Sequence, residues 1–257
     1  MSFKHITSRD NAIFKHLKKI ADNKRERNKE GKTLLDGVHL IAGYLQAFGE
    51  LELLIIPEGK SSQEAVALMQ DLADVNTTMF PTLLFAELTP VASSTGILAL
   101  VKLPTVAVPE KVDFALMLED IQDPGNLGSM LRTALGAGVD AVYLSKGCTD
   151  AWSPKCLRGG QGAQFQLAIV ESVDIVESIE GFAGSSYATT LSGDSIYTKD
   201  LTQSTAFVIG NEGGGLTNGV INAATAQVSI PMSAGLESLN AAAAAAVCLF
   251  ERQRQAT

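Results

Sequence analysis

The chain has 257 residues, of which 46% are hydrophobic and 19% charged, and its formal net charge is −8. This composition is that of a folded protein with one large or two ordinary domains, and it excludes an intrinsically disordered chain. No apolar run approaches the roughly 20 residues of a membrane-spanning helix. The polar N-terminus lacks the apolar core of a secretion signal. We therefore expect a cytoplasmic protein without a membrane segment.

The first hundred residues alternate short apolar runs with amphipathic stretches. Apolar spacing predicts four helices, at 8–30, 38–48, 62–73 and 81–88, and four strands, at 33–36, 51–56, 76–79 and 97–103. Either Ser8 or Asp10 can cap the first helix. Prolines at 104 and 109, spaced by small residues, are typical of an extended linker. We therefore expect a small α/β domain at 1–104, a linker at 105–112 and a second domain at 113–257.

The second domain repeats the alternation, beginning with a strand at 114–118 that is apolar on both faces. Further strands are predicted at 140–144, 166–170, 187–191, 206–210 and 227–230, and helices at 127–135, 172–182, 217–224 and 238–254. Strand-loop-helix-strand units favour a parallel sheet with right-handed crossovers. Such sheets bind ligands at the carboxyl ends of their strands.

Charge is distributed unevenly along the chain. Residues 1–32 contain ten basic and four acidic side chains, a balance of +6, whereas the remaining 225 residues carry −14. A basic segment on an acidic protein is typical of a phosphate-contacting surface. Its candidate contacts are Lys18, Lys19, Lys24 and Arg25. A solvated helix face that binds nothing is the alternative explanation.

The cysteines and histidines indicate neither a disulfide framework nor a metal site. Cys148, Cys156 and Cys248 are an odd number without paired spacing, which favours reduced thiols. All three histidines lie within the first 40 residues, far from the cysteines, and show no ligand spacing. We expect no bound metal.

Two familiar catalytic motifs are excluded by their context. Gly136–Ala141 matches the dinucleotide fingerprint G-x-G-x-x-A, but a helix precedes it and a strand follows, the reverse of what that fingerprint requires. It is therefore interpreted as a helix terminus. Ser233 and Ser238 have no histidine anywhere in the second domain, which excludes a serine-hydrolase triad there.

Three strand-to-helix loops carry polar residues at the same predicted edge of the sheet. They are Asp123–Arg132 (DPGNLGSMLR), Ile209–Gly215 (IGNEGGG), and Ile230–Met232 continuing through Glu237–Asn240. Each has a plain structural alternative: a salt bridge for the arginine, a glycine-rich turn, or a helix cap. Those alternatives do not explain three such loops that could converge on one cleft.

Together the three loops resemble motifs 1, 2 and 3 of the SpoU (TrmH-type) RNA 2′-O-ribose methyltransferases of the SPOUT superfamily. The resemblance covers 113–257. On fewer residues, Thr7-Ser8, Lys24-Arg25 and Asp36-Gly37, the first domain resembles the L30e-like domain that binds substrate RNA. The resemblance implies a trefoil-knotted α/β domain, a homodimer whose active site is completed across the interface, and ribosomal or transfer RNA as the substrate, with ribosomal RNA favoured.

The same resemblance implies S-adenosylmethionine as the cofactor and assigns residues to it. Five positions match or adjoin the cofactor site: Gly210, Ile230, Leu239, Leu191 and Met232. Five match the active site: Arg132, Asn126, Glu212, Ser238 and Asn240. The implied reaction is attack of a ribose 2′-hydroxyl on the cofactor's methyl group.

Arg132 corresponds to the family's catalytic arginine, for which two roles are open. It can help to remove the hydroxyl proton, or it can hold the adjacent phosphate and stabilise the developing alkoxide. Because a guanidinium stays protonated in nearly every protein site, we favour the second role. The alternative functions are a non-catalytic RNA-binding protein that kept the fold, and a methyltransferase acting on a base. The intact set of motif residues favours the ribose methyltransferase.

Overall fold

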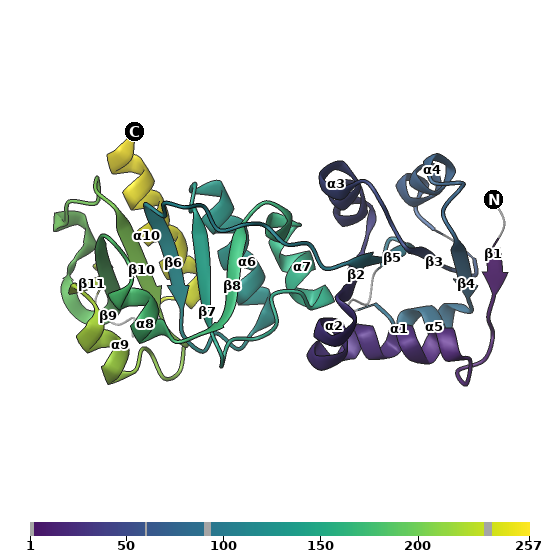
Figure 1. The fold of residues 1–257 in the computed structure, drawn as a ribbon, viewed down its shortest axis with the longest axis horizontal. Helices are drawn as coiled ribbons and strands as arrows, with labels where there is room; N and C mark the ends of the chain where they lie inside the picture. The colour runs from purple at the N-terminus through teal and green to yellow at the C-terminus, as the bar shows by residue number, and fades with distance from the viewer. Residues whose placement is uncertain (1–2, 60, 90–93, 234–237) are drawn as a thin grey trace. The chain divides into compact units, whose positions relative to one another are not determined.

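The computed structural model describes residues 3–59, 61–89, 94–233 and 238–257, and the chain separates into two compact units (Figure 1). The first unit contains residues 1–105 together with Asp150–Phe165. The second contains Val106–Thr149 and Gln166–Thr257. Among the described residues, no helix has both the length and the apolar character needed to cross a membrane.

The first unit is built on a mixed five-stranded sheet in the order β1-β4-β3-β5-β2. Its strands are β1 (Phe3–His5), β2 (Lys32–Asp36), β3 (Leu53–Pro57), β4 (Thr77–Phe80) and β5 (Leu98–Lys102). Its helices are α1 (Ala12–Asp22), α2 (Lys24–Glu30), α3 (Val38–Phe48), α4 (Gln63–Asp71), α5 (Thr82–Ala86), α7 (Pro154–Gly160) and the 3-10 turn η1 (Ala163–Phe165). Strand β5 runs antiparallel to β2 and β3, and the other pairings are parallel. Apolar residues of α1, α5 and the sheet form one hydrophobic cluster, and Leu40 and Ile41 of α3 are buried as well.

The single helix predicted at 8–30 is wrong, because Asn23 divides it into α1 and α2. Asn23 has an extended backbone, and its side-chain oxygen accepts hydrogen bonds from the backbone of Arg25 (2.8 Å) and Glu26 (3.3 Å). It therefore ends one helix and caps the next. The cap of α1 is Asn11, which accepts from Ile13 N at 2.9 Å, and not Ser8 or Asp10.

A segment from the second half of the sequence, 150–165, completes the first unit. Helix α7 packs on strand β2, and Thr33 donates a hydrogen bond to the carbonyl of Trp152 at 2.7 Å. Phe165 packs edge-on against Tyr44, with ring centroids 5.5 Å apart. Helix α7 was not predicted, because seven residues rich in proline and glycine show no helical periodicity.

A buried ion pair joins this segment to α2. Arg27, which is 3% exposed, donates from Nε and Nη2 to Asp150 Oδ2 at 2.7 and 2.6 Å. Its remaining nitrogen, Nη1, donates to the carbonyls of Ile20 and Ala21 at 2.6 and 2.9 Å. Asp150 also accepts a hydrogen bond from the backbone of Trp152 at 2.9 Å. Arg27 is therefore a structural residue and is not available to contact RNA, although it belongs to the basic N-terminal run.

The second unit is a parallel six-stranded sheet in the order β11-β9-β10-β6-β7-β8. Its strands are β6 (Phe114–Leu118), β7 (Ala141–Ser145), β8 (Ala168–Val173), β9 (Ser185–Ser195), β10 (Thr205–Ile209) and β11 (Ala226–Ser229). Its helices are α6 (Pro124–Gly136), α8 (Ile175–Glu180), α9 (Asn218–Ala223), α10 (Ala241–Ala256) and the 3-10 turn η2 (Ile196–Thr198). The predicted α/β class with a parallel sheet is confirmed.

Helices cover both faces of this sheet (Figure 1). Ala115, Met117, Ala206 and Val208 alternate along β6 and β10 and pack with residues of α8 and α9. Helices α6 and α10 pack against each other, and α10 also packs on β10. The predicted trefoil knot stays a prediction, since residues 234–237, which lead into α10, lie outside the described residues.

Candidate active site

Two helix caps bring asparagine side chains to the carboxyl edge of the second unit's sheet. Helix α6 begins at Pro124, and the Asp123 carboxylate caps it by accepting from Asn126 N at 2.8 Å. Asn126 therefore lies in the first turn of α6. Helix α10 is capped by Asn240, whose side-chain oxygen accepts from the backbone of Ala242 (3.0 Å) and Ala243 (3.3 Å).

The side-chain amide nitrogens of these two asparagines converge on one carboxylate. Glu212 Oε1 accepts hydrogen bonds from Asn126 Nδ2 and from Asn240 Nδ2, the latter at 3.0 Å. Asn240 Nδ2 also lies 3.2 Å from Asn126 Oδ1. The three residues come from three loops far apart in the sequence, so these loops do converge, and all three side chains are exposed or partly exposed to solvent.

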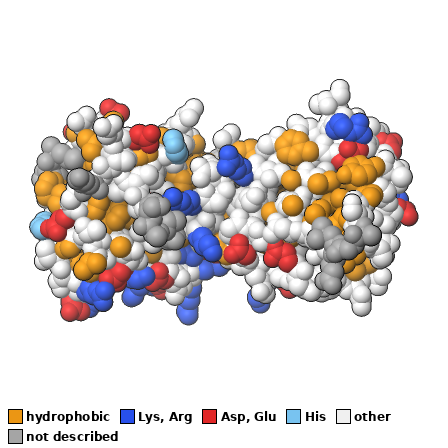
Figure 2. All heavy atoms as spheres, turned by 180° about the vertical axis from the view of Figure 1, so that it is seen from behind, with side chains coloured by type: hydrophobic (Ala, Val, Ile, Leu, Met, Phe, Trp, Pro, Cys, Tyr) orange, Lys and Arg blue, Asp and Glu red, His pale blue; other side chains and the backbone are white. Residues whose placement is uncertain are grey.

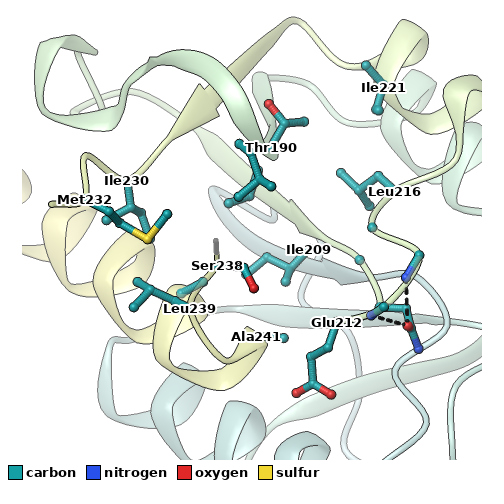
Figure 3. Close-up of a pocket in the computed structure, with 18 residues that line it drawn as sticks. Thr190, Ile209, Glu212, Leu216, Ile221, Ile230, Met232, Ser238, Leu239 and Ala241 are labelled. Carbon is teal, nitrogen blue, oxygen red and sulfur yellow. Dashed lines mark hydrogen bonds between the residues drawn. The ribbon is translucent and has the colours of Figure 1, made fainter. Parts of the chain in front are cut away.

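A pocket of about 540 Å³ adjoins this network (Figure 3). It is lined by all five residues predicted to bind the cofactor, Gly210, Ile230, Leu239, Leu191 and Met232, and also by Glu212 and Ser238. In Figure 3 the apolar side chains of Ile230, Met232 and Leu239 lie together on one side, and the carboxylate of Glu212 lies at the lower edge. Glu212 thus belongs both to the pocket and to the asparagine network.

The side chain and the backbone of Asn211 both help to hold the glycine-rich loop 210–215 in shape. Its Oδ1 accepts from the backbone of Gly213 (2.8 Å) and Gly214 (3.1 Å), and its carbonyl accepts from Gly215 N (2.8 Å). A Cβ atom at Gly210 would lie 2.4 Å from the backbone of Gly215. Gly210 is therefore required by the close approach of the loop to itself.

Two residues that shape this loop were not predicted, Asn211 and Glu119. The buried Glu119 carboxylate accepts hydrogen bonds from the backbone and the hydroxyl of Thr217, both at 2.8 Å, and so ties the end of the loop to β6. A carboxylate that directly follows an apolar strand must find such partners when it is buried, which was the available signal for Glu119. Asn211 had no comparable signal except its place beside Glu212.

Within one chain, Arg132 does not take part in the hydrogen bonds that join Asn126, Glu212 and Asn240. It is exposed, it does not line the pocket, and it has no hydrogen bond or ion pair within the part of the chain that the structure describes. Six residues after Asn126 on α6, it lies about 9 Å further along the helix axis and about one third of a turn around it. The described contacts therefore do not bring Arg132 together with Glu212.

The predicted RNA contacts all lie on α1 and α2 of the first unit. Lys19 and Arg25 are exposed, whereas Lys18 is paired with Asp22 at 2.6 Å. Lys24 is partly buried. Figure 2 shows basic and acidic side chains interspersed along this edge of the unit. Part of the basic charge is thus neutralised locally.

No metal site was predicted, and the described residues contain no group of three or more histidine, cysteine, aspartate or glutamate side chains arranged to hold a metal ion. The three cysteines are buried, and none of them forms a disulfide bond. Burial raises the pKa of Cys248 to about 12, so this thiol remains protonated near neutral pH.

A parallel α/β unit with three loops that meet beside a pocket at the carboxyl edge of its sheet is typical of enzymes that bind nucleotide-like ligands. The chain belongs to the SpoU rRNA Methylase family, whose model matches residues 113–250. It is 31% identical over 254 residues to the 23S rRNA (guanosine(2553)-2′-O)-methyltransferase RlmP of Bacillus subtilis (strain 168), covering 96% of this chain and 98% of that protein.

Two solved structures are similar to this chain over almost its whole length. One, described as an RNA 2′-O ribose methyltransferase, superposes with a TM-score of 0.84 at 29% identity and covers 98% of each chain. Another is the SpoU methyltransferase AviRb from Streptomyces viridochromogenes in complex with the cofactor AdoMet. It has a TM-score of 0.80 at 28% identity and covers 95% of this chain and 98% of that one.

Proposed function

We propose that this protein transfers the methyl group of S-adenosylmethionine to the 2′-hydroxyl of a ribose in RNA, with ribosomal RNA as the substrate. The observation that carries the proposal is the double role of Glu212, which lines the pocket and binds both asparagines of the neighbouring loops. The similarity over nearly the full chain to a protein named as a 23S rRNA 2′-O-methyltransferase supports ribosomal RNA.

The residues of the pocket fit this cofactor. A volume of about 540 Å³ lies within the range of small-molecule sites. Leu191, Ile230 and Leu239 offer apolar walls to an adenine ring, and the loop 210–215 offers backbone groups. The Glu212 carboxylate gives the rim a negative charge, which suits a cationic sulfonium. When bound, the cofactor supplies a methyl group activated by positively charged sulfur.

The chain's own side chains would orient the ribose and accommodate its charge. In the transfer the C–O bond forms at the 2′-oxygen as the C–S bond breaks, and the hydroxyl proton leaves to solvent. Asn126 and Asn240 hold the Glu212 carboxylate at the pocket, and Ser238 lines the same pocket. Arg132 is assigned to the phosphate next to the reacting ribose, where its fork stabilises the developing alkoxide.

Titration calorimetry with S-adenosylmethionine tests the cofactor assignment, and Gly210→Ala provides the sharpest variant. Its Cβ would meet the Gly215 backbone at 2.4 Å, so the loop must move. We expect the affinity to fall by about 5-fold to 150-fold, since overpacking costs roughly 1–3 kcal/mol. Gly219→Ala is the matched control, because its Cβ would meet other atoms only at ordinary distances of 3.9 Å or more and this residue of α9 does not line the pocket. Equal reductions of affinity in both variants would contradict the proposed packing.

A homodimer completes the proposed site. Arg132 does not line its own pocket, and α6 and α10 together expose Gly136 and Ala243 as well as Phe250, which is 47% exposed. Small residues beside an exposed aromatic ring suit an interface between helices of two protomers. In such a dimer, Arg132 of one protomer would lie near the pocket of the other. Light scattering should give twice the chain mass of 27.1 kDa at micromolar concentration. A mass of one chain, or an unchanged mass for an active Phe250→Glu variant, would argue against it.

We propose that the first unit is an L30e-like domain and that it binds the substrate RNA. We also propose that the protein acts in the cytoplasm. Lys19→Glu with Arg25→Glu should weaken binding of ribosomal RNA and reduce the slope of its salt dependence by roughly one for each phosphate that is no longer neutralised. S-adenosylmethionine affinity should stay the same. The control pair is Lys4→Glu with Lys102→Glu, which reverses equal charge at exposed positions on β1 and β5. If both pairs of substitutions change the slope equally, the basic residues of α1 and α2 form only a solvated surface and do not bind RNA specifically.

A further inference from the structure

The chain leaves strand β6 through a residue in a left-handed backbone conformation. Asp120 has φ of 56°, one of three positive values at non-glycine positions in the described parts of the chain. For L-residues this conformation is unfavourable by roughly 1–2 kcal/mol, and aspartate and asparagine tolerate it through local hydrogen bonds of their side chains. It persists only where the surroundings hold it in place.

The surroundings of Asp120 hold it from two sides. Its backbone N–H donates to Ser145 Oγ at 2.9 Å, and Ser145 Oγ donates to Asp120 Oδ1 at 2.7 Å. Gly147 leaves room for the carboxylate, since a Cβ there would lie 2.0 Å from Asp120 Oδ1. The end of β7 is therefore shaped around this one aspartate.

The carbonyl of Asp120 has a partner on the neighbouring loop. Asn211 Nδ2 donates to Asp120 O at 3.0 Å, while Asn211 Oδ1 accepts from the backbone of Gly213 and Gly214. One amide side chain therefore joins the loop that follows β6 to the glycine-rich loop that follows β10. Asp120 itself does not line the pocket.

The same two loops meet a second time at the candidate active site. Asn126, six residues after Asp120, donates to Glu212, the residue next to Asn211. The two loops are thus closed into a ring by two hydrogen bonds, Asp120–Asn211 at one end and Asn126–Glu212 at the other. A change in the conformation of Asp120 shifts the first bond and, through the short loop, the carboxylate of Glu212.

We propose that Asp120 is a positioning residue for methyl transfer. Its left-handed conformation, held by Ser145, presents its carbonyl to Asn211 and thereby sets the position of Glu212 against Asn126. This role rests on the proposed function, because the reaction that it tunes is the one at that site. A misplacement of about 1 Å near a reacting centre lowers turnover by on the order of 10²-fold.

Three substitutions at Asp120 distinguish the effect of its backbone conformation from the effect of its charge. Asparagine and glycine tolerate the left-handed region, whereas valine strongly disfavours it. We expect Asp120→Asn and Asp120→Gly to keep kcat within about threefold, and Asp120→Val to lower kcat at least about tenfold with KM for RNA unchanged. A carboxylate that touched RNA directly would instead raise KM in the asparagine and glycine variants, and that result would overturn the proposal.

Hydrogen exchange of the Gly213 and Gly214 amides gives a readout that needs no activity. Exchange should be faster in Asp120→Val and in Ser145→Ala, and unchanged in Asp120→Asn and in Glu180→Val, a control at an exposed position on α8. Ser145→Ala serves if the valine variant does not fold. Unchanged exchange in a folded Ser145→Ala variant overturns the coupling. If the exchange pattern appears but wild-type protein methylates no RNA, the proposed function fails while the coupling between the loops holds.

Discussion

Arg132→Ala is expected to lower kcat for RNA methylation by about 10²-fold or more while leaving S-adenosylmethionine affinity within about threefold. The two effects separate because Arg132 is exposed on α6 and does not line the pocket where the cofactor residues lie. Steady-state kinetics with saturating cofactor measure the first quantity, and calorimetry measures the second.

Arg132→Lys distinguishes the two roles open to this arginine. Lysine keeps a positive charge but lacks the planar fork that grips a phosphate from two sides, and its ordinary pKa is near about 10.4. If Arg132 positions the phosphate, the lysine variant should be nearly as inactive as the alanine variant. If Arg132 accepted the hydroxyl proton, the more easily deprotonated lysine would retain activity that rises with pH.

We expect the first outcome, because the guanidinium group is the harder of the two to deprotonate. A lysine variant with near-normal turnover at pH 9 would contradict the positioning role. Lys111→Ala is the control, since this exposed cation is paired with the half-exposed Asp113 and lies outside the pocket. It should turn over RNA like the wild-type protein.

Arg27→Met is expected to lower the free energy of unfolding of the first unit by about 3–5 kcal/mol. The substitution keeps the length and apolar stem of the side chain but leaves the Asp150 carboxylate buried without its charged partner. Adding Asp150→Asn removes that unpaired charge and keeps an acceptor for the Trp152 backbone. The double variant should therefore be more stable than Arg27→Met alone.

Trp152 makes this measurement specific to the first unit. It is the only tryptophan in the chain, it is buried, and it lies two residues from Asp150. Its fluorescence during urea unfolding therefore reports the segment that the ion pair anchors. Arg25→Met is the control, because Arg25 is an exposed arginine on the same helix. Surface changes of this kind stay within about 0.5 kcal/mol, and an equal destabilisation of both variants would contradict a structural role for the buried pair.

Much of the fold was predictable because its elements have strong periodic patterns. Helix α3 was predicted at its observed bounds because its apolar residues have helical spacing, and β6 because it is a short continuous apolar run. The break at Asn23 was not predicted, since the polar residues that follow it are mostly good helix formers and only the cap separates the two helices. Strand β1 was missed because its three residues are all exposed and show no alternation.

The candidate site was predictable at the level of loops but not of contacts. Glu212, Asn126 and Asn240 were singled out by resemblance, and their hydrogen bonds bring the three loops together. Asp120 and Asn211 could not be found in this way, because their importance lies in a backbone angle and in one bond between loops distant in sequence. The segment 150–165 illustrates the same point, since it joins the first unit only through tertiary contacts.

The central claim is the transfer of a methyl group to a ribose oxygen, and the position of the label in the product RNA tests it most directly. Ribosomal RNA from a strain lacking this protein would be incubated with the protein and S-adenosylmethionine labelled in its methyl group, then hydrolysed with alkali. A methylated 2′-oxygen cannot attack the neighbouring phosphate, so the label should appear in an alkali-resistant dinucleotide. Label found in mononucleotides would place the methyl group on a base, and no label at all, with bound cofactor, would indicate an RNA-binding protein without this activity.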